Sequence, residues 1–426
     1  MPEKASFIAC YGWHHTNKSW MHVTDSPDKP QSLWTPLKRP AFRNLMAAMA
    51  VSNTGYWMQT VAAAYLMRIW TNADPFMVSL VQTSLFIPPA LLLLPAGTWV
   101  DMLDRRKFMM FSQCWMMLAS CAVTILVLAD VQNGVALLAL LAFFAIGFAL
   151  NTPSQSAIWA DLVGIKEVPQ AVAIYSLTNN GARILGPSLA GALIPAFGAV
   201  GIMAFNALSY IGVIAALYSW KAPTRPRTTP QPFLSLLFGA FRYAKTSALF
   251  RAVLIRGGLF FTVSSILLAL LPVKVPEADD FGTVFSFMGL GAISGVFCFP
   301  RLALGRSREV IVSWAVGINA LAFISMALVS SIFALGVLTF VVGFTWFFVM
   351  SSMQIGAQMI LPDEIRGRGL ALLNLVLMSG YAFGSPLWGT VARLTSPNEA
   401  LLIAGSLSLI ALLLTFRMKL PQDKAG

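Results

Sequence analysis

Arg183 has the strongest physical reason of any residue in this sequence to carry a function. It stands near the centre of an apolar stretch, residues 171–194, whose length suits a helix that crosses a membrane. A guanidinium at that depth costs at least ~2.5 kcal/mol, so it has to face protein, water or a ligand. Two interpretations stay open. The side chain binds an anionic small molecule, or it bonds backbone carbonyls and Asn179 or Asn180 as a structural tie.

Other polar side chains stand on apolar stretches and are further candidates for a ligand cavity. Arg256 lies a third of the way into residues 252–273, where it either extends to the membrane surface or binds a ligand. Binding pockets combine aromatic walls with a few polar anchors, which points to mixed polar and aromatic positions. These candidates are Asn53, Trp57, Gln59, Asn151, Gln155, Trp346, Gln354, Asn374 and Tyr381. Ordinary packing or lipid contact is the alternative for each of them.

Several kinds of chemistry are absent from the pattern. No Asp or Glu is expected in the middle of a span, and the acids Asp74, Asp101 and Asp161 fall at span ends. No nucleophile–base set or phosphate-binding loop is recognisable, so no enzyme and no cofactor are predicted. The histidines His14, His15 and His22 and the nearby Cys10 all fall within residues 1–40, which favours an unstructured tail over a metal site.

The elements that position these residues are predicted to be membrane helices. Hydrophobic residues make up 57% of the chain and charged residues 11%, with a mean hydropathy of +0.73, far outside the range of soluble domains. In lipid the backbone must bond internally, and long runs of Leu, Ala, Phe and Met do so as helices rather than barrel strands. The predicted spans are 45–67, 78–100, 107–129, 134–156, 171–194, 199–219, 252–273, 283–303, 310–330, 333–355, 370–392 and 398–418.

The distribution of basic residues predicts the topology. With the N-terminus placed in the cytoplasm, all but five of the 29 Lys and Arg fall on the cytoplasmic side. Arg68, Lys274 and Arg393 lie near the other face, and Arg183 and Arg256 lie inside spans. Such an asymmetry predicts that both termini are cytoplasmic. The net charge of +12 therefore reflects the topology of the chain in the lipid bilayer, and no nucleic-acid partner is expected.

The chain repeats itself at an offset of 198 residues, which places Gly97 on Gly295, Gly186 on Gly384 and Gly191 on Gly389. Parallel six-helix halves with a cavity between them are one organisation of membrane transporters. We therefore expect a flexible cytoplasmic tail (1–40), a six-helix bundle (41–220), a cytoplasmic linker (221–247), a second six-helix bundle (248–420) and a short tail (421–426).

Four motifs over about residues 40–420 resemble the major facilitator superfamily. The loop with Gly97, Asp101, Arg105 and Arg106 is similar to the loop motif of that superfamily, although Met102 and Asp104 depart from it. The series Gly181, Gly186, Pro187 and Gly191 resembles the glycine–proline motif of its antiporters. Residues 42–60 and 362–368 look like the branch that contains the enterobactin exporter and the bacterial macrolide efflux proteins.

The resemblance implies an all-α major facilitator fold with twelve transmembrane helices in two bundles. It further implies a monomeric secondary transporter in a bacterial inner membrane that exports a small amphipathic molecule, siderophore-like or drug-like, by alternating access. Proton antiport is also implied. The proton would be carried by Asp74 or Asp101, which lie at span ends, or else the charge of the substrate itself would provide the coupling. The loop with Gly97 and Asp101 would form a latch, in which Asp161 receives Arg105 or Arg106. The glycine–proline series would let helices hinge or seal. Uptake of an organic anion or nutrient is one competing hypothesis, and a membrane scaffold or sensor is another.

The basic asymmetry yields a testable topology. Reporter fusions after Asp130 and Lys274 should report an extracytoplasmic location, whereas fusions at Lys107 and Lys221 should report the cytoplasm. Paired phosphatase and fluorescent-protein fusions at each site make the measurement. An extracytoplasmic signal at Lys221 would contradict the topology.

Overall fold

The computed structural model describes residues 32–220, 241–275, 277–362 and 365–421, without the side chains of 93–102, Ile165, Ile184, Ala278, Asp279 and Gly367. Their helices are α1 (Pro40–Trp70), α2 (Pro75–Met102), α3 (Arg105–Leu128), α4 (Gly134–Val163), α5 (Val168–Ser219), α7 (Ala248–Lys274), α8 (Ala278–Ala303), α9 (Arg308–Leu328), α10 (Ile332–Ile360), α11 (Arg366–Leu394) and α12 (Pro397–Thr415), with short 3-10 turns at Thr35–Lys38 and Ile165–Glu167. The predicted tail and linker lie mostly outside the described residues.

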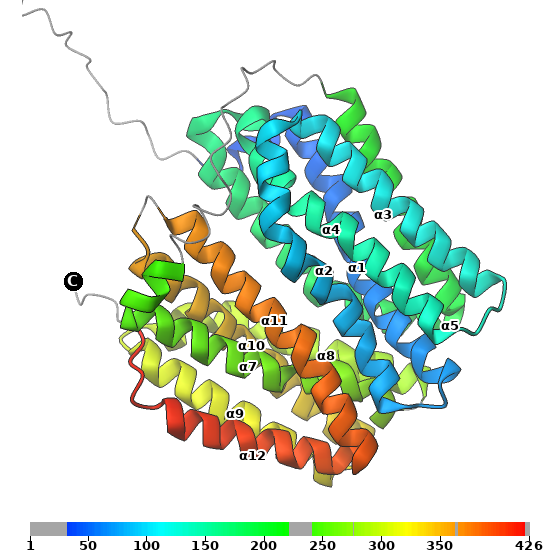
Figure 1. Cartoon of the computed structure of the whole chain (residues 1–426), viewed down its shortest axis with the longest axis vertical. Coiled ribbons are helices and arrows are strands. Elements are labelled where there is room, and N and C mark those ends of the chain that lie inside the picture. Colours follow the sequence, from blue (N-terminus) through cyan, green and yellow to red (C-terminus); the bar gives the residue numbers. More distant parts are fainter. Residues whose placement is uncertain (1–31, 221–240, 276, 363–364, 422–426) are drawn as a thin grey trace, which may run out of the picture.

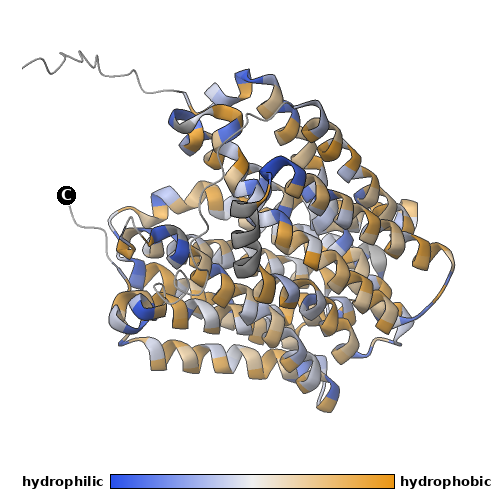
Figure 2. Ribbon diagram, turned by 45° about the horizontal axis from the view of Figure 1, so that its top comes forward, coloured by the Kyte–Doolittle hydropathy of each residue, from blue (hydrophilic) through white to orange (hydrophobic). Residues whose placement is uncertain are grey.

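The predicted all-α membrane fold with twelve helices is confirmed. Ten helices of the described part are long and apolar enough to cross a membrane. The 52 residues of α5 contain two spans, because Gly198 has φ 66° and interrupts the helix between the two spans predicted from the sequence. The remaining helix, α1, carries more polar residues than its neighbours and packs along α5. The ribbon in Figure 2 is coloured as apolar along much of the helices, and many of the strongly polar residues lie near helix ends.

The two parts of the chain use the same helix pairings. In the first part α1 packs on α5, α2 on α4, and α3 on α4 and α5. In the second part α7 packs on α11, α8 on α10, and α9 on α10 and α12. Figure 1 shows α1–α5 on one side of the molecule and α7–α12 on the other, and the two sides meet through α2 with α11 and α5 with α8. The sequence repeat is therefore matched by repeated packing.

Glycines at equivalent positions make equivalent contacts. A Cβ on Gly186 would overlap Trp57 and Thr54 of α1, and one on Gly384 would overlap Thr262 of α7. Each of these glycines thus holds its helix against the first helix of its own half. Small residues are needed there because helix backbones approach closely.

The next pair of repeated glycines joins the two halves. Gly191 of α5 lies against Gly282 of α8, and a Cβ on either would overlap the other backbone. Gly389 of α11 lies in the same way against Ser79 and Pro75 of α2.

The two ends of the molecule are named by the chain connections that they carry. The hairpin face carries the α1–α2, α3–α4, α7–α8, α9–α10 and α11–α12 connections, and the terminal face is the opposite end. The halves are closed on each other toward the hairpin face.

Two polar contacts support that closure. The Thr83 hydroxyl donates to the carbonyl of Ala382 at 3.0 Å, which links α2 to α11. Arg393, at the end of α11, lies 3.9 Å from the carboxylate of Asp74 in the turn before α2. Gly181, which was expected to allow close helix approach, does not do so here, because a Cβ built on it meets no atom within 4 Å.

A bulky residue at Gly191 should hold the hairpin face open. Gly191→Leu cannot keep the backbone contact with Gly282, so the halves should separate there. Gly181→Leu is the matched control, because it makes the same change on the same helix in open space. Spin labels on the exposed loop residues Val131 and Ser330 report the distance between the halves. We expect a longer distance for Gly191→Leu only, and an equal response of both variants would refute the assignment of the contact.

Candidate functional site

Two pockets meet in the middle of the molecule, between the halves. The polar pocket has a volume of about 530 Å³ for water-sized molecules and lies toward the terminal face. It is lined by Ser52, Asn53, Tyr56, Gln113, Met116, Phe148, Asn151, Thr152, Gln155, Tyr175, Ser176, Asn179, Asn180, Arg183, Tyr210, Trp346, Phe347, Met350, Ser351, Gln354, Ile355, Gln358, Asn374 and Met378.

The apolar pocket is smaller, about 100 Å³, and lies toward the closed hairpin face. It is lined by Trp57, Thr60, Val61, Ala64, Gln82, Phe86, Arg183, Pro187, Phe261, Leu268, Pro272, Phe281, Phe285, Met288, Gly289, Ala292, Trp346, Met350, Asn374, Leu377, Met378 and Tyr381. Both pockets are bordered by Arg183, Trp346, Met350, Asn374 and Met378, so these side chains lie where the two pockets meet.

The Arg183 guanidinium lies between two indole rings that come from different halves. Its central carbon is 5.0 Å from the ring centroid of Trp57 on α1 and 5.5 Å from that of Trp346 on α10. Cation–π attraction of this kind contributes roughly 0.5–2 kcal/mol per ring and offsets part of the cost of the buried charge. The side chain is half-buried overall, and its Nε atom is buried without a hydrogen-bond partner among the described residues.

The structural-tie interpretation of Arg183 finds little support in its neighbours. The amide nitrogen of Asn180 donates to the Ser176 carbonyl at 2.8 Å, and among the described residues no hydrogen bond joins the guanidinium to Asn179 or Asn180. None of the described residues that line the two pockets is acidic. The charge of Arg183 is therefore balanced by aromatic faces, and the buried Nε leaves a donor available for a ligand.

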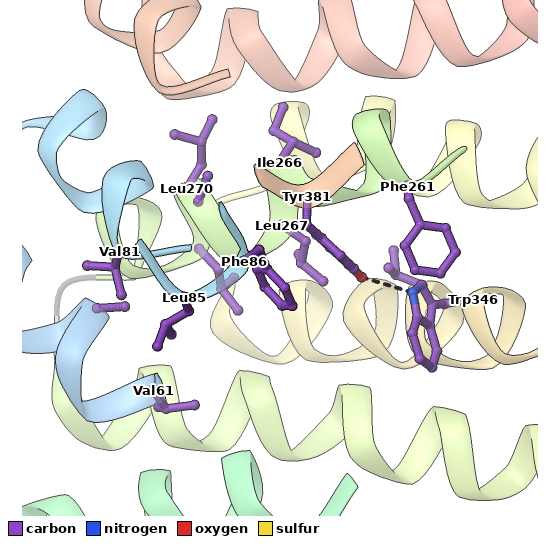
Figure 3. Packing of buried hydrophobic residues seen from close by; sticks show 14 of the residues in the cluster. Val61, Val81, Leu85, Phe86, Phe261, Ile266, Leu267, Leu270, Trp346 and Tyr381 are labelled. Carbon is purple, nitrogen blue, oxygen red and sulfur yellow. Dashed lines mark hydrogen bonds between the residues drawn. The ribbon is translucent and has the colours of Figure 1, made fainter. Parts of the chain in front are cut away.

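An aromatic chain extends from this charge into the apolar pocket. The Trp346 Nε1 donates to the Tyr381 hydroxyl at 3.0 Å, the dashed line in Figure 3. The Tyr381 ring stacks on Phe86 with a centroid distance of 5.2 Å, and Phe261 lies edge-on to it at 5.1 Å. Phe86 belongs to α2 of the first half, so this contact also connects the two halves.

Amide groups dominate the polar pocket and bond to one another. The Gln113 amide donates to Asn151 at 2.9 Å, the Tyr175 hydroxyl donates to Gln155 at 3.0 Å, and the Gln354 amide donates to Asn374 at 3.1 Å. Such groups both donate and accept, so they suit a ligand with several oxygen or nitrogen atoms.

Two of the predicted ligand candidates lie elsewhere. Gln59 points into the first half, where its oxygen accepts from Asn206 at 2.7 Å. Arg256 is buried between α7 and α9, pairs with Glu309, and donates to the Met418 carbonyl at 3.2 Å. The structure places neither in the central cavity, because the Gln59 oxygen and the Arg256 guanidinium each have a partner inside their own half. The other candidates all line one pocket or both: Asn53, Trp57, Asn151, Gln155, Arg183, Trp346, Gln354, Asn374 and Tyr381.

The loop-motif residues are placed in part. Gly97 and Asp101 lie in the part of α2 whose side-chain surroundings are not described. Arg105 lies 3.7 Å from the Asp161 carboxylate and donates to the Ala157 carbonyl, within the first half. Arg106 instead donates to the carbonyls of Leu217 and Tyr218, so it caps the end of α5. The contact of this loop with the second half stays a prediction.

Sequence reasoning missed several cavity residues, of which Gln82 is the most informative. Its side chain is 2% exposed and lines the apolar pocket, where its oxygen has no hydrogen-bond partner in the described part of the chain. The only sequence signal was a single amide in an apolar stretch, and Gln59 shares that signal while facing another way.

The comparisons with known proteins agree with this architecture. The family model described as transmembrane secretion effector matches residues 31–426. The enterobactin exporter EntS of Salmonella choleraesuis is 24% identical over 416 residues, which cover 91% of this chain and 96% of that protein. The uncharacterized MFS-type transporter YfiS of Bacillus subtilis is 27% identical over 203 residues, 46% of this chain and 48% of that protein.

Solved structures match the whole fold at low sequence identity. A point mutant of the nucleoside transporter NupG has a TM-score of 0.75 at 12% identity and covers 89% of this chain and 99% of its own. A bacterial homologue of the iron transporter ferroportin, in an inward-facing state, has a TM-score of 0.66 at 16% identity, with 91% and 98% coverage. These likenesses show the fold. Together with the family match they establish that the chain is a multi-pass membrane protein of the major facilitator superfamily, in its transmembrane secretion effector family.

Proposed function

We propose that this chain is a secondary transporter that exports a small amphipathic anion across the bacterial inner membrane by alternating access. The observation that carries this proposal is the Arg183 guanidinium, held between Trp57 and Trp346 at the junction of the two pockets. A cation without an acidic neighbour in the described lining favours an anionic cargo. The polar pocket would receive the cargo from the cytoplasm, with both termini on that side.

The contacts between the halves suggest how the cavity would change access. We propose that residues 41–220 and 248–420 rock against each other as units. Opening the hairpin face would separate Gly191 from Gly282 and Asp74 from Arg393. Arg183 would then keep Trp57, which belongs to its own half, and lose Trp346. A cargo anion would compensate the charge during that exchange.

Export rather than uptake is supported by the resemblance to the enterobactin exporter and by the glycine–proline series in α5. Proton antiport is part of the proposal on the same ground. Asp101 as a latch and Asp74 as a proton carrier are its two acidic elements, and both lie at helix ends.

Substitution of Arg183 should separate anionic from cationic cargo. In everted membrane vesicles that respire on lactate, an exporter accumulates its cargo inside the vesicle. We expect accumulation of the anion para-hydroxycinnamate by the wild type, and a loss of roughly tenfold or more in Arg183→Gln, because a charge-assisted hydrogen bond is removed. Arg183→Lys should also transport poorly, because Lys lacks the planar fork that stacks on indole rings.

The control is a cation in the same vesicles. Tetraphenylphosphonium transport, if the wild type supports it, should change little in Arg183→Gln, and the amount of folded protein should not fall. Equal losses for the anion and the cation that follow the protein amount would identify Arg183 as structural and contradict the proposal. Collapse of the proton gradient with a protonophore tests the antiport.

A further inference from the structure

We propose that Gln82 is a second polar anchor of the cargo site, which accepts a hydrogen bond from a hydroxyl or N–H group on the apolar body of the anion. This inference rests on the proposed function, since it takes the anion at Arg183 as given. It narrows the cargo to a class: anions whose apolar or aromatic body carries a hydrogen-bond donor away from the charge.

The state of Gln82 is the first support. The side chain is only 2% exposed and lines the apolar pocket, and its Oε1 atom has no partner among the described residues. A buried acceptor without a partner is unfavourable, because it has lost its bonds to water. Other buried polar atoms of the described chain also lack a partner, but in the lining of the apolar pocket Gln82 Oε1 is the acceptor in that state, and a ligand in the pocket could supply the donor.

The surroundings of Gln82 provide the second support. The apolar pocket is built from Val61, Phe86, Leu268, Phe281 and Phe285, which suit an aromatic or aliphatic body. Arg183 borders the same pocket, and its Nε is an unpaired buried donor. The pocket thus has an orphan cationic donor at its border with the polar pocket and an orphan acceptor in its wall. A matching ligand carries an acceptor anion and a neutral donor, separated by an apolar spacer.

The test measures binding to the full-length protein in lipid nanodiscs by calorimetry. The probes are para-hydroxybenzoate, para-hydroxycinnamate and para-hydroxybiphenylcarboxylate, each beside its para-methoxy partner, which keeps the anion and body but cannot donate. One of the three bodies should have the length that brings its anion to Arg183 and its hydroxyl to Gln82. For that body we expect the hydroxy form to bind the wild type roughly tenfold more tightly than its methoxy partner. Gln82→Leu should abolish this preference while the methoxy form binds as before.

Two further variants keep the outcomes distinct. Leu85→Met, one turn along α2 and buried outside the pocket lining, should preserve the preference. Arg183→Gln should weaken both members of each pair alike. Without ligand, Gln82→Leu should have a higher Tm than the wild type, because an unsatisfied buried amide is removed.

The results separate the inference from the proposed function. If Arg183→Gln weakens anion binding but no hydroxy–methoxy pair differs between wild type and Gln82→Leu, the role of Gln82 is wrong and the anion site stands. If Arg183→Gln leaves the binding of all probes unchanged, the anion site itself is wrong. A hydroxy preference that persists in Gln82→Leu would also overturn the inference.

Discussion

The cation–π contact of the Arg183 guanidinium with both Trp57 and Trp346 is the interaction on which the cavity depends. A charge near the centre of the bilayer costs about 2.5–3.5 kcal/mol on insertion scales, and two aromatic faces at roughly 0.5–2 kcal/mol each offset part of that cost. The two rings belong to different halves, so this compensation is complete only while the halves hold their present arrangement. The same side chain separates an amide-lined pocket from an aromatic one. Charge balance, shape of the cavity and arrangement of the halves are thus coupled at one residue.

The repeat in the sequence explains why the halves can meet so closely at the hairpin face. Gly186 and Gly384 each serve the packing of their own half, whereas Gly191 and Gly389 each face the other half. One helix in each half therefore carries both kinds of contact, five residues apart. Because backbone approaches backbone at Gly191 and Gly282, the closed face depends on shape rather than on strong bonds. A hydrogen bond from Thr83 to Ala382 and a long ion pair between Arg393 and Asp74 accompany it.

The fold was predictable because its signal consists of long runs of residues that are read directly along the sequence. Apolar runs and basic loops mark the spans, and the interruption at Gly198 falls between the two ranges assigned to the fifth and sixth spans. The cavity was predictable only in part, because it depends on the rotation of each helix about its axis. Gln59 and Gln82 are both single amides in apolar stretches, yet Asn206 binds the first and the second faces the cavity. Arg183 and Arg256 are likewise both cations in apolar spans, but Arg256 pairs with Glu309, which lies far away in the sequence, whereas Arg183 faces the cavity. Such partners lie far away along the chain, and no local pattern reveals them.

The ion pair of Arg256 with Glu309 has a consequence for the end of the chain. Arg256 also donates to the Met418 carbonyl, Glu309 accepts from the backbone N–H of Leu420, and Arg308 donates to the Pro421 carbonyl at 3.4 Å. The segment after α12 therefore ties together α7 and α9 at the terminal face. An uncompensated buried charge typically costs about 3–5 kcal/mol, so loss of Glu309, which would leave the buried Arg256 unpaired, would loosen this corner. The last described residues thus stiffen the second half at the terminal face, and an affinity tag has to begin beyond Pro421 to leave that stiffness intact.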